Sequence, residues 1–127
     1  MDTSNIAKKF YENAEFHMDL RRIAVRDDFF LQNDYVKNKK FGNVIDIGGG
    51  IYSFLEKISA YKKYYIDINQ NFCDINTSRY GYRTYCYDLN QGFPPSLCTD
   101  LHGDGVDLIT CFEVFEHLFL WTNLWQI

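Results

Sequence analysis

The hydrophobic pattern of the chain changes character near residue 41. Before that point apolar residues recur at the spacing of helix faces, and after it short apolar runs rich in β-forming residues alternate with helical stretches. The runs predict strands at residues 44–47, 64–68, 82–87 and 106–112. Strands that alternate with helices pair in parallel and carry helices on both faces of the sheet. We therefore predict a single domain of the α/β class, with a mainly parallel sheet of about four strands and flanking helices.

The first 41 residues predict a helical segment that precedes the sheet. Apolar residues at intervals of four, from Ile6 to Met18, follow two possible N-cap residues, Ser4 and Asn5. This spacing places the apolar side chains on one face, so a first helix is expected to end near Arg22.

Asp27 and Asp28 predict the start of a second helix, because a carboxylate at the N-cap accepts hydrogen bonds from the first-turn amides. The apolar residues that follow would form its buried face, and a lysine cluster formed by Lys37, Lys39 and Lys40 would mark its end. We interpret this cluster as a solvated helix end, where cations complement the helix dipole.

Three consecutive glycines, Gly48, Gly49 and Gly50, follow the first predicted strand. Glycine adopts backbone conformations that are closed to residues with side chains, and it lets a ligand approach the main chain closely. Phe54, Leu55 and Ile58 predict the inward face of a helix after the glycine turn. A strand, a tight turn and a helix start together predict a docking place for a nucleotide-sized ligand.

Acidic residues recur at matching places in successive strands. Asp67 lies 21 residues after Asp46, and Asp88 lies 21 residues after Asp67. A carboxylate at the end of the second strand, about twenty residues after a glycine turn, can accept both hydroxyl groups of a ribose. Asp46 lies inside an apolar strand, where a carboxylate needs a cation or strong donors, so a ligand with an ammonium or sulfonium group would suit it. The spacing predicts an adenosine-containing ligand.

In four segments the sequence resembles the class I S-adenosylmethionine-dependent methyltransferases. The segments are residues 44–50, 65–68, 87–94 and 106–118. The last of them, Val-Asp-Leu-Ile-Thr-Cys-Phe-Glu-Val-Phe-Glu-His-Leu, is the most specific to the family. The resemblance implies a Rossmann-like core that binds S-adenosylmethionine over residues 42–127, after the helical segment 1–41.

This resemblance implies a set of cofactor contacts, of which the ribose contact also agrees with the acidic spacing. The glycine turn would approach the methionine part, the second strand end would bind the ribose, the third would frame the adenine, and the fourth would lie beside the cofactor. In chain order, these residues are Asp46, Gly48, Gly49, Gly50, Asp67, Ile68, Asp88, Leu89, Phe112 and Glu113.

Two features depart from the family pattern. Tyr52 stands where many members carry a third glycine, so its side chain could crowd or cover the methionine end. Family domains continue through three further strands, whereas this sequence stops at Ile127. We therefore expect an incomplete class I methyltransferase fold, and both a fragment and a natural short protein remain open.

Methyl transfer needs little from side chains beyond holding the acceptor in line with the activated methyl group. An oxygen or nitrogen acceptor can need a base, for which His117 and Glu116 are candidates. Either could instead fix a neighbouring loop by a hydrogen bond. With Glu113 they resemble the metal-binding set of the small-RNA 2'-O-methyltransferases, but the histidine that would complete it is missing, so we expect no metal.

Two other functions remain open beside a methyltransferase acting on an unidentified small-molecule or macromolecular acceptor. A non-catalytic remnant or subunit could keep the cofactor half of the fold and act through association. An NAD-binding oxidoreductase is less favoured, because Ser53 stands where the dinucleotide fingerprint needs its third glycine.

Composition informs the choice of partners more than the fold. The formal net charge of -4 provides no long-range attraction to nucleic acid, so nucleic acid is not an expected partner. Four cysteines without a Cys-x-x-Cys pair, and no signal-peptide pattern, indicate the cytoplasm. No apolar run is long enough to span a membrane. The edge of the fourth strand and the apolar residues 118–127 predict self-association into a homo-oligomer.

Overall fold

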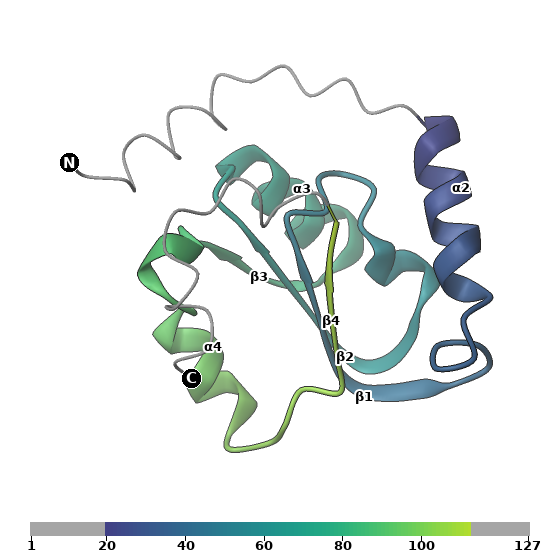
Figure 1. Ribbon diagram of the computed structural model, residues 1–127. Coiled ribbons are helices and arrows are strands. Elements are labelled where there is room, and N and C mark those ends of the chain that lie inside the picture. The colour runs from purple at the N-terminus through teal and green to yellow at the C-terminus, as the bar shows by residue number, and fades with distance from the viewer. Residues whose placement is uncertain (1–19, 113–127) are drawn as a thin grey trace.

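A four-stranded sheet lies at the centre of the molecule, with helices packed around it (Figure 1). This computed structural model describes residues 20–112, apart from the side chains of Leu20 and Arg22. The strands are β1 (Lys40–Ile47), β2 (Ser59–Asp67), β3 (Arg83–Cys86) and β4 (Leu108–Cys111). The helices are α2 (Leu20–Leu31), α3 (Gln70–Tyr80) and α4 (Pro95–Leu101), with two 3-10 turns, η1 (Phe54–Lys57) and η2 (Leu89–Gln91).

The strands lie in the order β3-β2-β1-β4, and every neighbouring pair is parallel. The chain runs outward from β1 through β2 to β3, and then returns to the other side of β1 to form β4. The predicted α/β class, with a parallel, Rossmann-like sheet of four strands, is confirmed for the described residues. β4 lies at an edge of this sheet, and self-association through that edge stays a prediction.

Both faces of the sheet are covered, because side chains alternate between the faces along each strand. One face packs against η2 and α4, and the other packs against α2, η1 and α3 (Figure 1). The buried residues of the first cluster are Ile45, Ile47, Tyr64, Ile66, Leu89, Leu97 and Leu101. Those of the second are Phe41, Val44, Phe54, Leu55, Ile58, Tyr65 and Cys73. The prediction of helices on both faces is therefore confirmed.

The predicted start of a helix at the aspartate pair is wrong. α2 continues through Asp27 and Asp28 and ends at Leu31. The Asp27 side chain is only 2% exposed, and its carboxylate forms ion pairs with Arg26 and Lys57. Ion pairing therefore replaces the N-cap role, and it ties α2 to η1.

The lysine cluster does not lie at a helix end. α2 has no basic residue in its last turn, and Lys37, Lys39 and Lys40 lie in the following loop and at the start of β1. The interpretation that these cations complement a helix dipole is therefore wrong. β1 also begins at Lys40, before the predicted start of the core at residue 42.

The connection after the glycine turn is shorter than predicted. Phe54 and Leu55 lie in the single 3-10 turn η1, and Ile58 already has an extended backbone. β2 begins at Ser59 because its first half pairs with the start of β1, which leaves too few residues for a longer helix. β3 and β4 have four residues each, fewer than predicted, and α4 lies in the segment between these two strands.

Several predicted segments lie outside the described residues. They are the helix that begins near Ser4, the helix that follows Glu113 and the apolar run at 118–127. Within residues 20–112, no helix has the length and apolar character needed to cross a membrane. Self-association through the apolar run stays a prediction.

Candidate functional site

Most of the described residues predicted to bind a ligand lie at one edge of the sheet, where the parallel strands end. β1 and β4 end side by side, with Ile47 opposite Cys111. Beyond β1, the Gly48 N–H donates to the Ile66 carbonyl (2.8 Å), and the main chain after β3 donates to the Asp67 carbonyl in the same way (2.9 Å). β2 and β4 pair with opposite sides of β1, so the strand order reverses between β1 and β4, and ligands of open α/β sheets bind at such switch points.

The glycine turn needs glycine for two different reasons. Gly48 and Gly50 have φ angles of 68° and 67°, in the left-handed region that side-chained residues rarely adopt. At Gly49 a Cβ atom would lie 2.0 Å from Oδ2 of Asp46 and 3.2 Å from Cα of Ser53. The turn therefore folds tightly over the Asp46 carboxylate.

Asp46 is fully buried, and the chain itself provides the strong donors that its carboxylate needs. The Ser53 hydroxyl donates to Oδ2 at 2.5 Å, and the Thr110 hydroxyl donates to Oδ1 at 2.8 Å. Burial raises the pKa of Asp46, while these two hydrogen bonds and nearby Arg26 lower it. Asp46 thus connects β1, the glycine turn and β4, and its direct contact with a ligand stays a prediction.

Asn76 of α3 also holds the turn, although no sequence motif marks it. It is fully buried, and its Nδ2 donates to the Gly50 carbonyl at 2.9 Å and to the Phe72 carbonyl at 2.8 Å. The hydroxyl of Tyr80 donates to the Ile51 carbonyl at 3.5 Å. The only sequence signal for this role is that a polar residue, Asn76, stands on the buried face of α3.

Asp67 ends β2, with 8% of its surface exposed. Its Oδ2 accepts a hydrogen bond from the Tyr65 hydroxyl, and its Oδ1 accepts one from the Asn69 N–H at 3.0 Å. Burial raises the pKa of Asp67 to about 6, against the lowering effect of these two bonds and of the Ile68 main chain. Each carboxylate oxygen can accept a further hydrogen bond, so the group can still bind a hydroxyl pair. Ile68, beside it, is half-buried.

Asp88 is the N-cap of η2 and lies two residues after the end of β3. Its Oδ1 accepts a hydrogen bond from the Asn90 N–H at 2.9 Å, whereas its buried Oδ2 has no donor in the described part of the chain. A buried acceptor without a partner is costly, and it indicates a missing donor such as a ligand or a water molecule. Leu89 is buried below it in the core.

Arg26 of α2 reaches the same edge of the sheet, which the sequence pattern did not indicate. Its guanidinium lies 4.5 Å from the centre of the Phe112 ring, and Nη2 lies 3.5 Å from the carbonyl of half-buried Tyr52, which accepts from it. The Phe112 ring also packs on Phe54, with ring centres 5.6 Å apart. The guanidinium otherwise binds Asp27 through Nε and Nη2, so within residues 20–112 its Nη1 has no hydrogen-bond acceptor.

Glu113, Glu116 and His117 lie outside the described residues, so their predicted roles as cofactor contact and base stay predictions. The described strand ends offer two carboxylates as acceptors, Asp67 and Asp88, and a guanidinium beside a glycine turn. Such a set suits a ligand that carries hydroxyl and amino donors at one end and a carboxylate at the other.

Comparison with known proteins identifies no relative from which a function could be inferred. No family model matches the chain, and no curated protein matches it at a significant level. The functional assignment therefore rests on the chemistry of the strand ends.

Proposed function

We propose that the chain binds S-adenosylmethionine at the carboxyl ends of its strands and transfers the methyl group to an acceptor. The observation that carries this proposal is the buried Oδ2 of Asp88, an acceptor without a donor within residues 20–112. The resemblance to class I methyltransferases implies that the amino group of adenine would lie at this strand end. An amino group would supply the missing hydrogen bond, so this residue fits the cofactor.

The ribose would lie one strand closer to the centre of the sheet. Asp67 ends β2 beside the glycine turn, because Gly48 and Asp67 lie next to each other across the β1–β2 pair. Its two oxygens each have capacity for one more hydrogen bond, and a ribose presents two neighbouring hydroxyl donors. Asp67 must be ionised to accept from both of them.

The amino-acid end of the cofactor would lie over the glycine turn. The left-handed Gly48 and Gly50 allow close approach to the main chain, and Arg26 lies next to the turn through its contact with the Tyr52 carbonyl. The Nη1 group of Arg26 suits a carboxylate, for which guanidinium is the best-matched side chain. Tyr52 would then lie at the border of the methionine part.

When bound, the cofactor supplies an activated methyl group that needs no covalent help from the protein. The chain would bind and orient it, and the β1–β4 switch point would keep the methyl group beside the end of β4. A base for the acceptor would come from Glu116 or His117, as the family resemblance implies.

Binding is tested first, by calorimetric titration with S-adenosylmethionine, S-adenosylhomocysteine and NAD. We expect the first two to bind and Asp88→Asn to weaken both roughly tenfold or more. In that variant the side-chain oxygen still accepts the hydrogen bond from the Asn90 N–H. The NH2 group then replaces Oδ2 and faces the adenine amino group, so the acceptor for this amino group is lost. Asp104→Asn, at an exposed carboxylate away from the strand ends, is the matched control. Tight binding of NAD alone would overturn the proposal.

Transfer is tested separately, with methyl-labelled cofactor and a cell extract. We expect label to enter an acceptor with the wild-type chain and to be lost with Asp67→Ala. Cofactor binding without any transfer would instead support the non-catalytic subunit that acts through association.

A further inference from the structure

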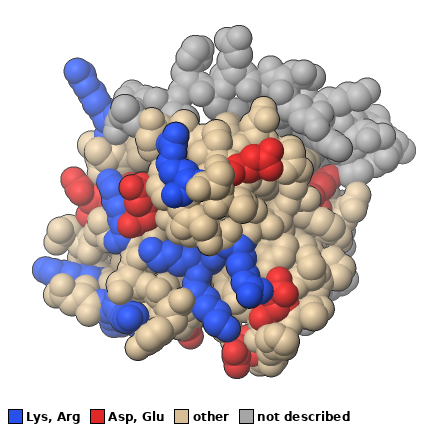
Figure 2. Space-filling model, turned by 180° about the vertical axis from the view of Figure 1, so that it is seen from behind, with Lys and Arg blue, Asp and Glu red and all other residues tan. Residues whose placement is uncertain are grey.

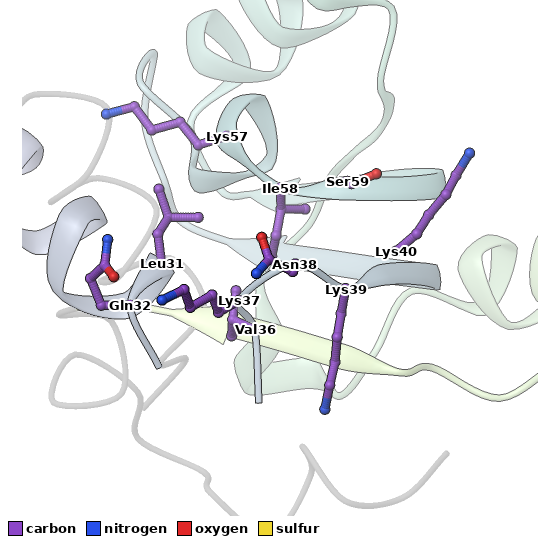
Figure 3. Close-up of a pocket in the computed structure, with 10 residues that line it drawn as sticks. All are labelled: Leu31, Gln32, Val36, Lys37, Asn38, Lys39, Lys40, Lys57, Ile58 and Ser59. Carbon is purple, nitrogen blue, oxygen red and sulfur yellow. The ribbon is translucent and has the colours of Figure 1, made fainter. Parts of the chain in front are cut away.

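A basic hollow lies at the amino ends of β1 and β2, at the opposite end of the sheet from Asp67 and Asp88. It is open and has a volume of about 510 Å³, and it lies between the loop after α2, the start of β1 and the η1–β2 junction (Figure 3). Lys37, Lys39 and Lys40 line it. The hollow is therefore distinct from the cofactor site proposed above.

All charged residues that line the hollow are positively charged. Its lining contains four lysines, the fourth being Lys57, and no carboxylate. Lys57 is held by Asp27 at 3.1 Å, whereas Lys37, Lys39 and Lys40 form no ion pair with a carboxylate among residues 20–112. Cations grouped without counter-charges repel one another, and a bound anion relieves this repulsion.

The ring contacts of Lys39 and Lys40 can be exchanged for contacts with an anion at little cost in free energy. The Lys39 ammonium lies 4.4 Å from the Tyr35 ring centre, and the Lys40 ammonium lies 4.0 Å from that of Tyr61. Both groups point outward from the rim, while Lys37 extends across the hollow (Figure 3). Both tyrosines are largely exposed, and a cation–ring contact in water is weaker than a charge-assisted hydrogen bond to phosphate. An anion could therefore draw these ammonium groups inward.

The floor of the hollow is apolar. Ile58 is buried, and Leu31 and Val36 are half-buried. The amide of Gln32 lies at one side of the hollow, and that of Asn38 lies between Lys37 and Ile58 (Figure 3). Small-molecule sites combine an apolar lining with a few polar groups, and have volumes of roughly 300–1,000 Å³. The hollow has this combination, with cations as its strongest polar groups.

The net charge of the whole chain does not argue against an anionic ligand here. Residues 20–112 hold eleven of the 13 Lys and Arg residues and eleven of the 17 Asp and Glu residues, so the excess of acid lies outside them. Three of those carboxylates, Asp27, Asp46 and Asp67, are buried. Cations therefore outnumber anions on the surface of this part, and many basic side chains gather on the lower half of the face in Figure 2.

We infer that this hollow binds a small molecule that carries two or three linked phosphate groups. Lys37, Lys39 and Lys40 would contact the phosphates, since three ammonium groups without an ion pair among residues 20–112 match a multiply charged anion better than a single phosphate. Leu31, Val36 and Ile58 would lie under the rest of the ligand.

The test is calorimetric titration of the full chain with inorganic tripolyphosphate and with uridine triphosphate, which avoids the proposed adenosine site. We expect saturable 1:1 binding that weakens as salt is added. Lys37→Gln/Lys40→Gln should weaken it roughly tenfold or more. Lys62→Gln removes an exposed lysine of β2 outside the hollow and should change Kd by less than about twofold. Circular dichroism checks that both variants fold.

The two ligands distinguish the source of the phosphate group. Tighter binding of uridine triphosphate would support a nucleotide that uses the apolar floor, and tighter binding of tripolyphosphate would support an inorganic polyphosphate. Three outcomes overturn the inference: no saturable binding of either ligand, an equal loss with Lys62→Gln, or binding of a single-stranded oligonucleotide alone.

Discussion

At the scale of single residues, Asp67 makes the stability of the fold depend on pH. Burial raises its pKa from 3.8 to about 6, so the folded state favours the neutral carboxyl group. The contribution to stability is complete below about pH 4 and is lost as pH rises through about 6. We expect the free energy of unfolding to fall by at most about 3 kcal/mol from this group between pH 4 and 7. Urea denaturation across this range measures it.

Asp67→Asn isolates this effect from other titrations. The amide keeps the shape of the side chain and does not titrate, so the variant should lack the part of the pH dependence that belongs to Asp67. Asp104→Asn, at an exposed carboxylate, should follow the wild-type curve. Equal pH dependence in the wild type and Asp67→Asn would contradict the raised pKa.

Gly49 has no room for a side chain in the turn. A Cβ atom would lie 2.0 Å from Oδ2 of Asp46, and this carboxylate cannot move away while Ser53 and Thr110 hold it. We expect Gly49→Ala to destabilise the fold by about 3 kcal/mol, at the upper end of overpacking effects. Thermal and urea denaturation measure the change.

Gly105→Ala is the matched control for that substitution. Its Cβ would meet no atom within 4 Å, and its backbone lies outside the left-handed region. The free energy of unfolding of the variant should lie within about 0.5 kcal/mol of the wild-type value. It could be slightly higher, because alanine restricts the unfolded chain. A similar loss at both glycines would show that the Asp46 contact is not the cause.

The sequence was informative for residues whose role depends on local spacing. Gly48, Asp67 and Asp88 could be placed at strand ends because each follows a short apolar run, and the structure confirms those positions. Arg26 and Asn76 could not, because each acts on the glycine turn across 26 residues of chain. Nothing in the local pattern of α2 or α3 indicates such a contact.

At the scale of elements, α2 depends on a buried ion-pair group. Asp27 accepts from Arg26 at 2.7 Å and lies 3.1 Å from the ammonium of Lys57 in η1. Asp27→Asn would leave both cations without their counter-charge, although Lys57 is partly exposed and retains access to water. We expect a loss of about 2 kcal/mol, below the usual range for breaking a fully buried pair.

Asp28 provides the control for the prediction at Asp27. Asp28 lies on the same helix, is exposed, and differs from Asp27 in having no ion pair among the described residues. Asp28→Asn should change the free energy of unfolding by less than about 0.5 kcal/mol. Equal effects at both positions in urea denaturation would indicate a general charge effect rather than the pairing of α2 with η1.

Element boundaries were less predictable than element types, for a physical reason. β1 and β2 begin with polar residues, which pair through their main chains, so the apolar pattern marks only their buried halves. The same pairing leaves η1 one turn long. α4 is a seven-residue helix that follows Pro94, and it buries only Leu97 and Leu101, too little for a visible helical period.

At the scale of the whole molecule, the sheet separates two surfaces of different chemistry. Its carboxyl edge carries Asp67 and Asp88, and its amino edge carries the lysine hollow. β1 has eight residues, so it spans about 23 Å between the two edges at the usual rise per residue. The order β3-β2-β1-β4 could be anticipated only in part, since apolar runs do not say on which side of β1 the last strand pairs.

This separation predicts that the two proposed sites act independently. Substitutions more than about 10 Å apart without shared partners usually have additive effects. We expect Asp88→Asn to leave the Kd of uridine triphosphate within about twofold of the wild-type value, and Lys37→Gln/Lys40→Gln to do the same for S-adenosylmethionine. Calorimetric titration of each ligand, with and without saturating amounts of the other, measures both effects.

Thermodynamic linkage makes this a strict comparison, because any coupling must change both affinities by the same factor. A shift of more than about fivefold in both would show that the sheet transmits binding from one edge to the other. The path would then have to include β1, the strand that joins the lysines at Lys40 to the glycine turn at Gly48. Complete exclusion of each ligand by saturating amounts of the other would instead indicate that both ligands compete for one site.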